Sequence, residues 1–221
     1  RTNEFIRTAL DHNEKGGLLP VWELGGNETF CMIGYHCIPV IADAYSKGIR
    51  EYDAEKAFAA MKHSANQNHF GLEAYKEKGF IDAGDEPESA SKTLEYAYDD
   101  WCISEMARRM RKTEDQKVFA KRGQSFRNLF NPQTGFFQAR MNGGWFSPFD
   151  PAEVNFNYTE ANAWQYTFFV PQDIPGMIEL VGGTDAFEKH LDNLFAASKS
   201  LSGREQVDIT GLIGQYALHT I

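Results

Sequence analysis

A single carboxylate stands among aromatic and amide side chains in the stretch from residue 155 to residue 166. Glu160 follows Tyr158 and precedes Trp164 and Gln165. Aromatic faces cover the apolar side of a sugar, amides hydrogen-bond its hydroxyl groups, and an acid in apolar surroundings can keep its proton near neutral pH and hand it to a leaving oxygen. The stretch therefore predicts a carbohydrate-cleaving site in which Glu160 donates a proton.

A structural interpretation of the same residues is also open. Thr159 is of a type that caps helices, which would make Glu160 a first-turn acid favoured by the helix dipole. The two roles are compatible, so a cap at this position would not exclude the chemistry.

Further candidates lie on loops or next to them. The loop 25–29 carries Glu28 among exposed polar groups, and an ordinary interhelical turn is the alternative. His36 follows a Gly-Tyr pair, and a structural histidine is the alternative there. Glu95 and Asp99 stand four residues apart on one face of a predicted helix. Such a pair either holds a substrate, tunes a neighbouring group or faces solvent.

Helices must position these residues, because apolar side chains recur with a helical period along most of the chain. In the first helix Phe5 and Ile6 are expected on the buried face. We expect a small β-hairpin within residues 136–145 and a loop over residues 66–88. The predicted helices cover residues 1–14, 32–47, 53 onward, 91–111, 113–130, 160–169, 174–180, 184–195 and 211–217. The pattern indicates a mainly all-α fold with long loops that present a site at one end of a helical scaffold.

The composition excludes several classes of function. The chain has 221 residues, a net charge of -9 and a pI of about 5.2, which argues against a nucleic-acid partner because binding one needs clustered Lys and Arg. No run of about 18 apolar residues predicts a membrane span, and no secretion signal is visible at Arg1. The three cysteines, Cys31, Cys37 and Cys102, form no Cys-x-x-Cys pair, so we expect free thiols rather than a zinc site.

Six stretches together resemble glycoside hydrolase family 92, the calcium-dependent exo-acting α-mannosidases. They occur in the family's order and cover nearly the whole chain. In sequence they are Gly17-Leu18-Leu19-Pro20-Val21-Trp22; Met32-Ile33-Gly34-Tyr35-His36 with Ile41 to Tyr45; Thr93 to Trp101; Tyr158-Thr159-Glu160-Ala161-Asn162-Ala163-Trp164-Gln165-Tyr166; Val170-Pro171-Gln172-Asp173; and Gly211 to Ala217.

The resemblance implies a fold and a reaction. Residues 1–221 would be a single partial domain from the middle of an (α/α)₆ barrel, without the family's N-terminal β-sandwich. The reaction would be inverting hydrolysis of terminal α-mannosides, of the α-1,2 type, on glycans such as N-glycans. Bound calcium would help distort the sugar ring. The full-length protein would be periplasmic, on the cell surface or secreted.

The resemblance also assigns roles to single residues. Glu160 would be the general acid. Trp164, Gln165, Glu28 and His36 would lie at or near the sugar pocket as substrate-binding residues.

The departures from the family pattern carry predictions of their own. The motif that holds the family's catalytic base is missing, and after Gly214-Gln215-Tyr216-Ala217 the chain continues with Leu218-His219 instead of the His-Gly-Asn-Glu-Pro that lies next to the family's calcium site. We therefore expect a weak or inactive catalyst with an incomplete calcium site. Half a barrel also exposes apolar helix faces, which predicts self-association through the open edge.

Two rival functions stay open on the sequence alone. In another (α/α)-barrel carbohydrate enzyme, a second carboxylate such as Asp99 or Asp100 would work beside Glu160. In a non-catalytic sugar-binding helical module, binding would survive the substitution Glu160→Gln.

Overall fold

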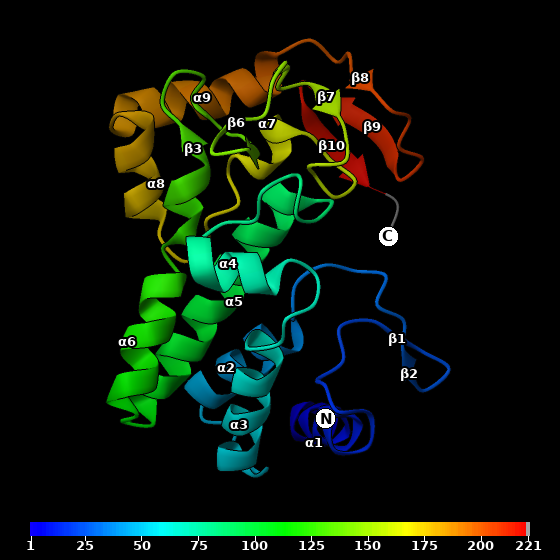
Figure 1. The fold of residues 1–221 in the computed structure, drawn as a ribbon, viewed down its shortest axis with the longest axis vertical. Helices are drawn as coiled ribbons and strands as arrows, with labels where there is room; N and C mark the ends of the chain where they lie inside the picture. The colour runs from blue at the N-terminus through cyan, green and yellow to red at the C-terminus, as the bar shows by residue number, and fades with distance from the viewer. Residues whose placement is uncertain (220–221) are drawn as a thin grey trace. The chain divides into compact units, whose positions relative to one another are not determined.

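The computed structural model describes residues 1–219 and shows a mainly helical chain with short antiparallel hairpins. The chain forms two compact units, which are drawn in Figure 1. The first unit contains residues 1–76 and 95–124, and the second contains residues 77–94 and 125–221. The all-α expectation is thus correct in its main feature.

The first unit is built from helices α1 to α3, the first part of α4, most of α5 and α6. Apolar side chains from α2, α3 and α5 form its core, including Ile41, Phe58, Met61 and Ile103, each 2% exposed or less. The elements are α1 (Thr2–Gly16), β1 (Glu23–Leu24), β2 (Asn27–Glu28), α2 (Cys37–Ser46), α3 (Ala54–Ala65), α4 (Leu72–Lys78), α5 (Ser89–Arg109) and α6 (Thr113–Arg122).

The second unit carries the stretch around Glu160. Its core is rich in aromatic rings: Phe137 packs edge-on against Phe126 and Phe130, with Val170 and Met177 buried in the same cluster. The elements are the 3₁₀ helix η1 (Ser125–Leu129), β3 (Phe130–Asn131), β4 (Phe136–Phe137), β5 (Arg140–Met141), β6 (Gly144–Trp145), β7 (Glu153–Val154), α7 (Ala163–Tyr166), α8 (Ile174–Val181), α9 (Thr184–Ala196), β8 (Ser202–Gly203), β9 (Ile209–Ile213) and β10 (Tyr216–His219).

The helix predicted over residues 211–217 is wrong. These residues belong to the antiparallel pair β9–β10, in which Ile213 faces Tyr216 across a two-residue turn. Gly214 has a φ of 61°, and a side chain there would lie 2.3 Å from the Leu194 carbonyl oxygen. β-Branched and aromatic residues around such a turn favour a hairpin over a helix.

The predicted helix over residues 160–169 is also wrong in its extent. Only Ala163 to Tyr166 are helical, and the residue that caps them is Asn162, whose side chain accepts a hydrogen bond from the Gln165 backbone. Thr159 is therefore not the cap, and Glu160 lies in the preceding loop. The hairpin predicted within residues 136–145 is confirmed for residues 140–145 by the pairing of β5 with β6. Its first part is wrong, because Phe136 and Phe137 pair with Asn131 and Phe130 instead.

Three further expectations need correction. The loop predicted over residues 66–88 contains α4. The helix beginning at Thr113 ends at Arg122, and a 3₁₀ turn continues the chain towards Phe130. Phe5 is 72% exposed, whereas Ile6 is buried as expected, because the buried stripe of α1 is narrower than the helical pattern suggested.

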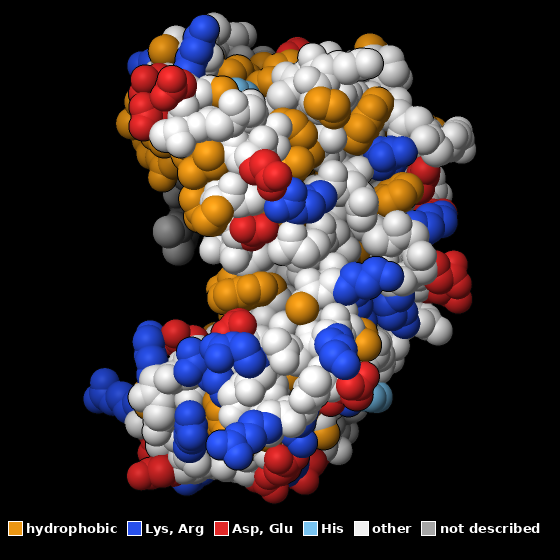
Figure 2. Space-filling view, turned by 90° about the vertical axis from the view of Figure 1, so that its left-hand side faces the viewer, with side chains coloured by type: hydrophobic (Ala, Val, Ile, Leu, Met, Phe, Trp, Pro, Cys, Tyr) orange, Lys and Arg blue, Asp and Glu red, His pale blue; other side chains and the backbone are white. Residues whose placement is uncertain are grey.

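Basic and acidic side chains stand beside one another on the surface of the first unit (Figure 2). Lys62 pairs with Asp115 at 2.6 Å, and Lys112 pairs with Glu55 at 2.7 Å. Exposed pairs of this kind stabilise a fold by about 0–1 kcal/mol each. No helix among the described residues has the length and apolarity needed to cross a lipid bilayer.

Candidate active site

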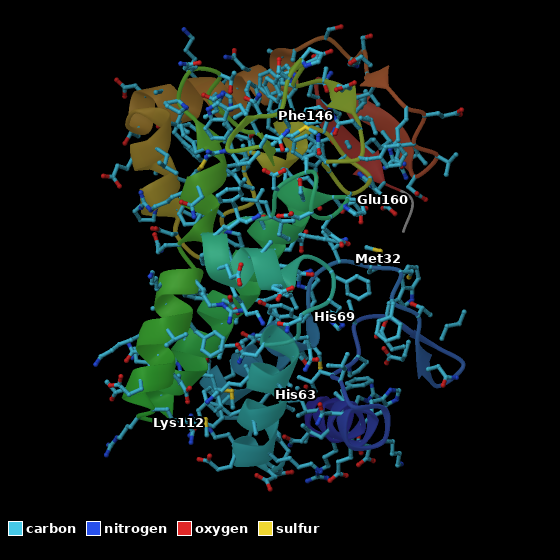
Figure 3. The ribbon with its side chains drawn as sticks, in the orientation of Figure 1. Met32, His63, His69, Lys112, Phe146 and Glu160 are labelled. Atoms are coloured by element: carbon cyan, nitrogen blue, oxygen red, sulfur yellow. The ribbon has the colours of Figure 1, made fainter. Side chains whose placement is uncertain are left out.

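Glu160 lies on the loop between β7 and α7, with a backbone conformation that is uncommon for glutamate (Figure 3). Its φ is 51°, in the left-handed region that L-residues avoid. Its side chain is half-buried and makes no hydrogen bond or ion pair with any described residue. A carboxyl group without a protein partner, on a strained loop residue, is free to meet a ligand.

Hydrogen bonds on the N-terminal side hold this loop in place. The Tyr158 hydroxyl donates to the Phe137 carbonyl oxygen at 2.7 Å, and burial raises the pKa of that hydroxyl. The Thr159 backbone donates to the Ser91 hydroxyl at 2.9 Å. Both partners belong to the core of the second unit, so the chain entering Glu160 is fixed at two points.

Three amide side chains, of which Asn162 and Gln215 are buried, fix the loop on its C-terminal side. Asn162 and Gln165 form a reciprocal cap at the start of α7. The Asn162 amide also donates to the Gln215 side chain at 2.9 Å, and Gln165 donates to the Gln215 backbone carbonyl at 2.9 Å. Gln215 in turn donates to the carbonyls of Ser198 and Ser200. The turn between β9 and β10 is thereby tied to the residues that follow Glu160.

Sequence reasoning assigned no role to Gln215, although it lies in one of the stretches that match the family. The residue is 2% exposed, and its side chain satisfies three polar groups. A polar residue directly after a turn glycine, among apolar strand residues, was the available signal.

Trp164 packs into an aromatic cluster next to the loop. Its ring stacks on His190 with centroids 5.4 Å apart and meets Phe136 edge-on at 4.7 Å. Burial lowers the pKa of His190, which keeps the imidazole neutral between the rings. Trp164 itself is only partly buried, so part of its indole ring stays accessible.

Glu28, in the first unit, organises its own loop. Its carboxylate accepts hydrogen bonds from the backbone of Val21 at 2.5 Å, Trp22 at 3.1 Å and Phe30 at 2.9 Å. The loop also forms one wall of a cavity of about 480 Å³. The ordinary turn that the sequence left open is thus in fact a β1–β2 hairpin held by Glu28.

His36 is held between two carboxylates of α5. Its Nε2 lies 2.5 Å from Glu95, and its Nδ1 lies 2.9 Å from Asp99. Burial alone would lower the pKa of His36, but hydrogen bonds and charge from Asp99 and Glu95 raise it to about 10. The imidazole is therefore a cation at neutral pH. Among the alternatives for the Glu95 and Asp99 pair, tuning a neighbouring group is the one that this geometry fits.

Asp99 and Asp100 are both fully buried. Asp99 also accepts from the Tyr35 backbone at 2.8 Å. Asp100 accepts from the Tyr35 hydroxyl at 2.8 Å, and from Tyr75 and Arg122. Burial raises the pKa of Asp100, and Arg122 opposes this, leaving a pKa of about 6. Both aspartates are thus committed to interior contacts.

A family model described as the glycosyl hydrolase family 92 catalytic domain matches residues 1–219. The chain belongs to glycosyl hydrolase family 92. Within the family, it aligns at 38% identity and a TM-score of 0.91 with an α-mannosidase of Bacteroides thetaiotaomicron, whose structure holds mannoimidazole; the match covers 98% of this chain and 30% of that one.

Two further relatives agree with this family assignment. An inverting family 92 mannosidase of the same bacterium has 32% identity and a TM-score of 0.85, covering 90% of this chain and 28% of that one. A protein of Arthroderma benhamiae described as an uncharacterized secreted glycosidase is 29% identical over 94% of this chain and 32% of its own length. The chain spans about 30% of the length of the relatives it matches.

The calcium expected from the family resemblance was tested against the side chains of this family 92 chain. Calcium takes oxygen ligands, usually with several carboxylates among them. Within residues 1–219, no group of three or more His, Cys, Asp or Glu side chains is arranged to hold a metal ion. The described side chains therefore do not fit a calcium site by themselves.

Proposed function

We propose that this chain is part of an inverting, exo-acting α-mannosidase in which Glu160 is the general acid. The observation that carries the proposal is the geometry of Glu160: a half-buried carboxyl group without a protein partner, on a loop fixed at both ends. Support comes from the structural relatives, which are an α-mannosidase and an inverting mannosidase.

The proposed step for Glu160 is transfer of its proton to the glycosidic oxygen as the bond to the leaving group breaks. General acid help of this kind contributes about 10²–10⁴-fold to a rate. After each cycle the carboxylate must be reprotonated, so access to solvent is required. Glu160 is only half-buried, so its carboxyl group keeps access to solvent.

Inversion also requires a base that activates water on the opposite side of the sugar. The two carboxyl groups of such enzymes lie about 6.5–9.5 Å apart, with the water between them. Asp99 and Asp100 are unsuited to this role, because each is fully buried and already accepts hydrogen bonds from protein groups. This argues against the rival enzyme that would use them. We propose that the base lies outside these residues, so that the 221-residue chain alone is weak or inactive.

The proposed sugar-binding residues divide between the two units. Trp164 and Gln165 belong to the loop region of Glu160, and we propose that they orient that loop while the accessible part of the indole faces the sugar. Glu28 and His36 belong to the first unit. His36 is 36% exposed. Both of its ring N–H groups already pair with Glu95 and Asp99, so we propose that the exposed part of the ring lies against the sugar, with Glu28 shaping the neighbouring loop.

The proposed substrates are terminal α-1,2-mannosides of glycans such as N-glycans. We further propose that the full-length enzyme needs calcium supplied by ligands beyond those described, and that it works in the periplasm, at the cell surface or outside the cell. A relative described as secreted supports that location.

Self-association is part of the same proposal. Apolar side chains on the last helix and hairpin of the second unit are exposed, including Phe195 at 47% and Tyr216 at 46%. Their rings pack together with centroids 5.6 Å apart. We propose that this surface joins copies of the isolated chain, and a monodisperse monomer in light scattering would contradict it.

The test of the proposed function compares this chain with a version extended at both ends to the length of the matched mannosidases. Hydrolysis of an aryl α-mannoside is measured with and without calcium. We expect activity only in the extended, calcium-loaded protein, with release of the β-anomer of mannose. Activity in the 221-residue chain alone would contradict the proposal that the base lies outside these residues. Sugar binding without hydrolysis in either chain would favour the non-catalytic sugar-binding module.

A further inference from the structure

A cavity of about 410 Å³ opens in the second unit. Three segments line it: the loop 83–87 before α5, the hairpin region around Phe146 (Figure 3), and residues 155–157. The last segment leads directly into the loop of Glu160.

Backbone hydrogen bonds hold the walls of this cavity. Glu88 donates to the Phe156 carbonyl at 2.6 Å, and Ala90 donates to the Asn157 carbonyl at 3.1 Å. On the other side, Ala83 donates to the Arg140 carbonyl at 2.8 Å. The cavity is therefore formed in advance, as small-molecule sites usually are.

The Asn157 side chain is an unpartnered amide that lines this cavity. Asn157 is 8% exposed, yet its side chain makes no hydrogen bond with any described residue, whereas its backbone carbonyl is bonded. Buried amides are nearly always paired, because leaving them unpaired is unfavourable. An amide that offers both a donor and an acceptor to an open cavity indicates a ligand with hydroxyl groups.

The remaining lining favours an uncharged ligand with an apolar face. Met141, Phe146 and Phe156 supply apolar surface. The two carboxylates at the rim are already neutralised, Asp85 by Lys78 at 2.7 Å and Glu86 by Lys92 at 2.5 Å. A charged ligand would therefore find no free partner there, whereas a sugar fits both the apolar surface and the free amide.

The position of the cavity suggests which sugar it binds. Asn157 precedes Glu160 by three residues, and three residues span at most about 11 Å. The general acid acts at the oxygen that joins the cleaved mannose to its leaving group. We propose that this cavity binds a sugar of the leaving group, with the Asn157 amide on its hydroxyls and the apolar lining against its ring. The proposal rests on the proposed function of Glu160.

The first test measures kcat/KM of the extended protein on an aryl α-mannoside, which lacks a second sugar, and on α-1,2-mannotriose. Asn157→Ala is expected to lower kcat/KM on mannotriose about tenfold, the factor that one uncharged hydrogen bond contributes, and to leave the aryl substrate unchanged. Asn193→Ala, on the exposed surface of α9, is the matched control and should change neither. An equal effect of Asn157→Ala on both substrates, or no effect, overturns the inference.

A second variant guards against misfolding. Phe156 is 69% exposed, so Phe156→Ala removes cavity surface without opening the core. If Asn157→Ala lowers the melting temperature, Phe156→Ala replaces it with the same expectation, and loss of activity on both substrates counts against the cavity.

Binding to the 221-residue chain separates this inference from the proposed function. Mannotriose binding, measured by ligand-observed NMR, should survive Glu160→Gln and weaken in Asn157→Ala. If the extended protein hydrolyses no mannoside, the proposed function fails, and the binding measurement still decides whether the cavity holds a sugar. If the extended protein hydrolyses mannosides but Asn157→Ala leaves mannotriose binding unchanged, the inference about the cavity fails and the proposed function stands.

Discussion

The backbone conformation of Glu160 yields a prediction about stability that is independent of any activity. Its φ of 51° places an L-residue in the left-handed region. That conformation costs about 1–2 kcal/mol for a residue with a Cβ and nothing comparable for glycine. The side chain has no protein partner, so its removal loses no hydrogen bond. The change in the free energy of unfolding on substitution at this position therefore measures mainly the cost of the backbone conformation.

Two variants separate the backbone from the side chain. Glu160→Ala removes the carboxylate and keeps the Cβ, whereas Glu160→Gly removes both. Glycine loses about 0.4–1 kcal/mol through the larger entropy of its unfolded chain, so the net advantage of Gly over Ala should be about 1 kcal/mol. Urea unfolding of the two variants, followed by circular dichroism, measures that difference as a shift in midpoint at constant slope.

The matched control is an exposed position with ordinary helical geometry. At Glu188, on α9, glycine should be less stable than alanine by about 1 kcal/mol, the reverse sign. If Glu160→Gly is no more stable than Glu160→Ala, the left-handed conformation carries no cost and the argument from strain is refuted. If both variants are more stable than the original, the site trades stability for chemistry.

Three further outcomes follow from the buried polar groups. The pKa of His36 is raised from 6.5 to about 10. Its contribution to stability is therefore complete below about pH 6.5 and is lost as the pH rises through about 10. The urea midpoint should fall over that window in the original chain and fall less in His36→Gln. Replacing Asp100 by Asn removes the carboxylate that neutralises the mostly buried Arg122, which should lower the free energy of unfolding by about 3–5 kcal/mol. A loss below about 1 kcal/mol in urea titration would contradict this. Replacing Gln215 by Ala removes its side-chain hydrogen bonds to the buried Asn162 and to the carbonyls of Ser198 and Ser200. Hydrogen exchange should therefore rise in the loop of Glu160, and unchanged exchange there would refute the proposed tie.

The sequence predicted the elements whose apolar period is long and undisturbed. The helices α5 and α8 appear within two residues of their expected bounds, because repeated burial on one face is a local signal. The helix expected at residues 211–217 does not form, because Gly214 makes a tight turn. Only glycine fits there, since a side chain would collide with the carbonyl oxygen of Leu194, which is distant in sequence. A close approach of this kind has no local signature.

The candidate site shows the same division. The residue types around Glu160 pointed to carbohydrate chemistry, and the spacing of Glu95 and Asp99 indicated a shared face. Their partner His36 could not be found by spacing, since it lies about sixty residues away in the chain. The Asn157 amide has no hydrogen-bond partner because no described group lies within reach of it. That could not be predicted from the sequence, since it depends on the three-dimensional arrangement.

The most direct test of the central claim uses leaving groups that differ in their need for a proton. In the extended protein, Glu160→Gln should lower kcat/KM by about 10²–10⁴-fold on an α-mannobiose, whose sugar leaving group must be protonated. The same variant should lose far less on 2,4-dinitrophenyl α-mannoside, whose leaving group departs as a stable anion. Equal losses on both substrates, or normal hydrolysis of the disaccharide, would show that Glu160 is not the general acid.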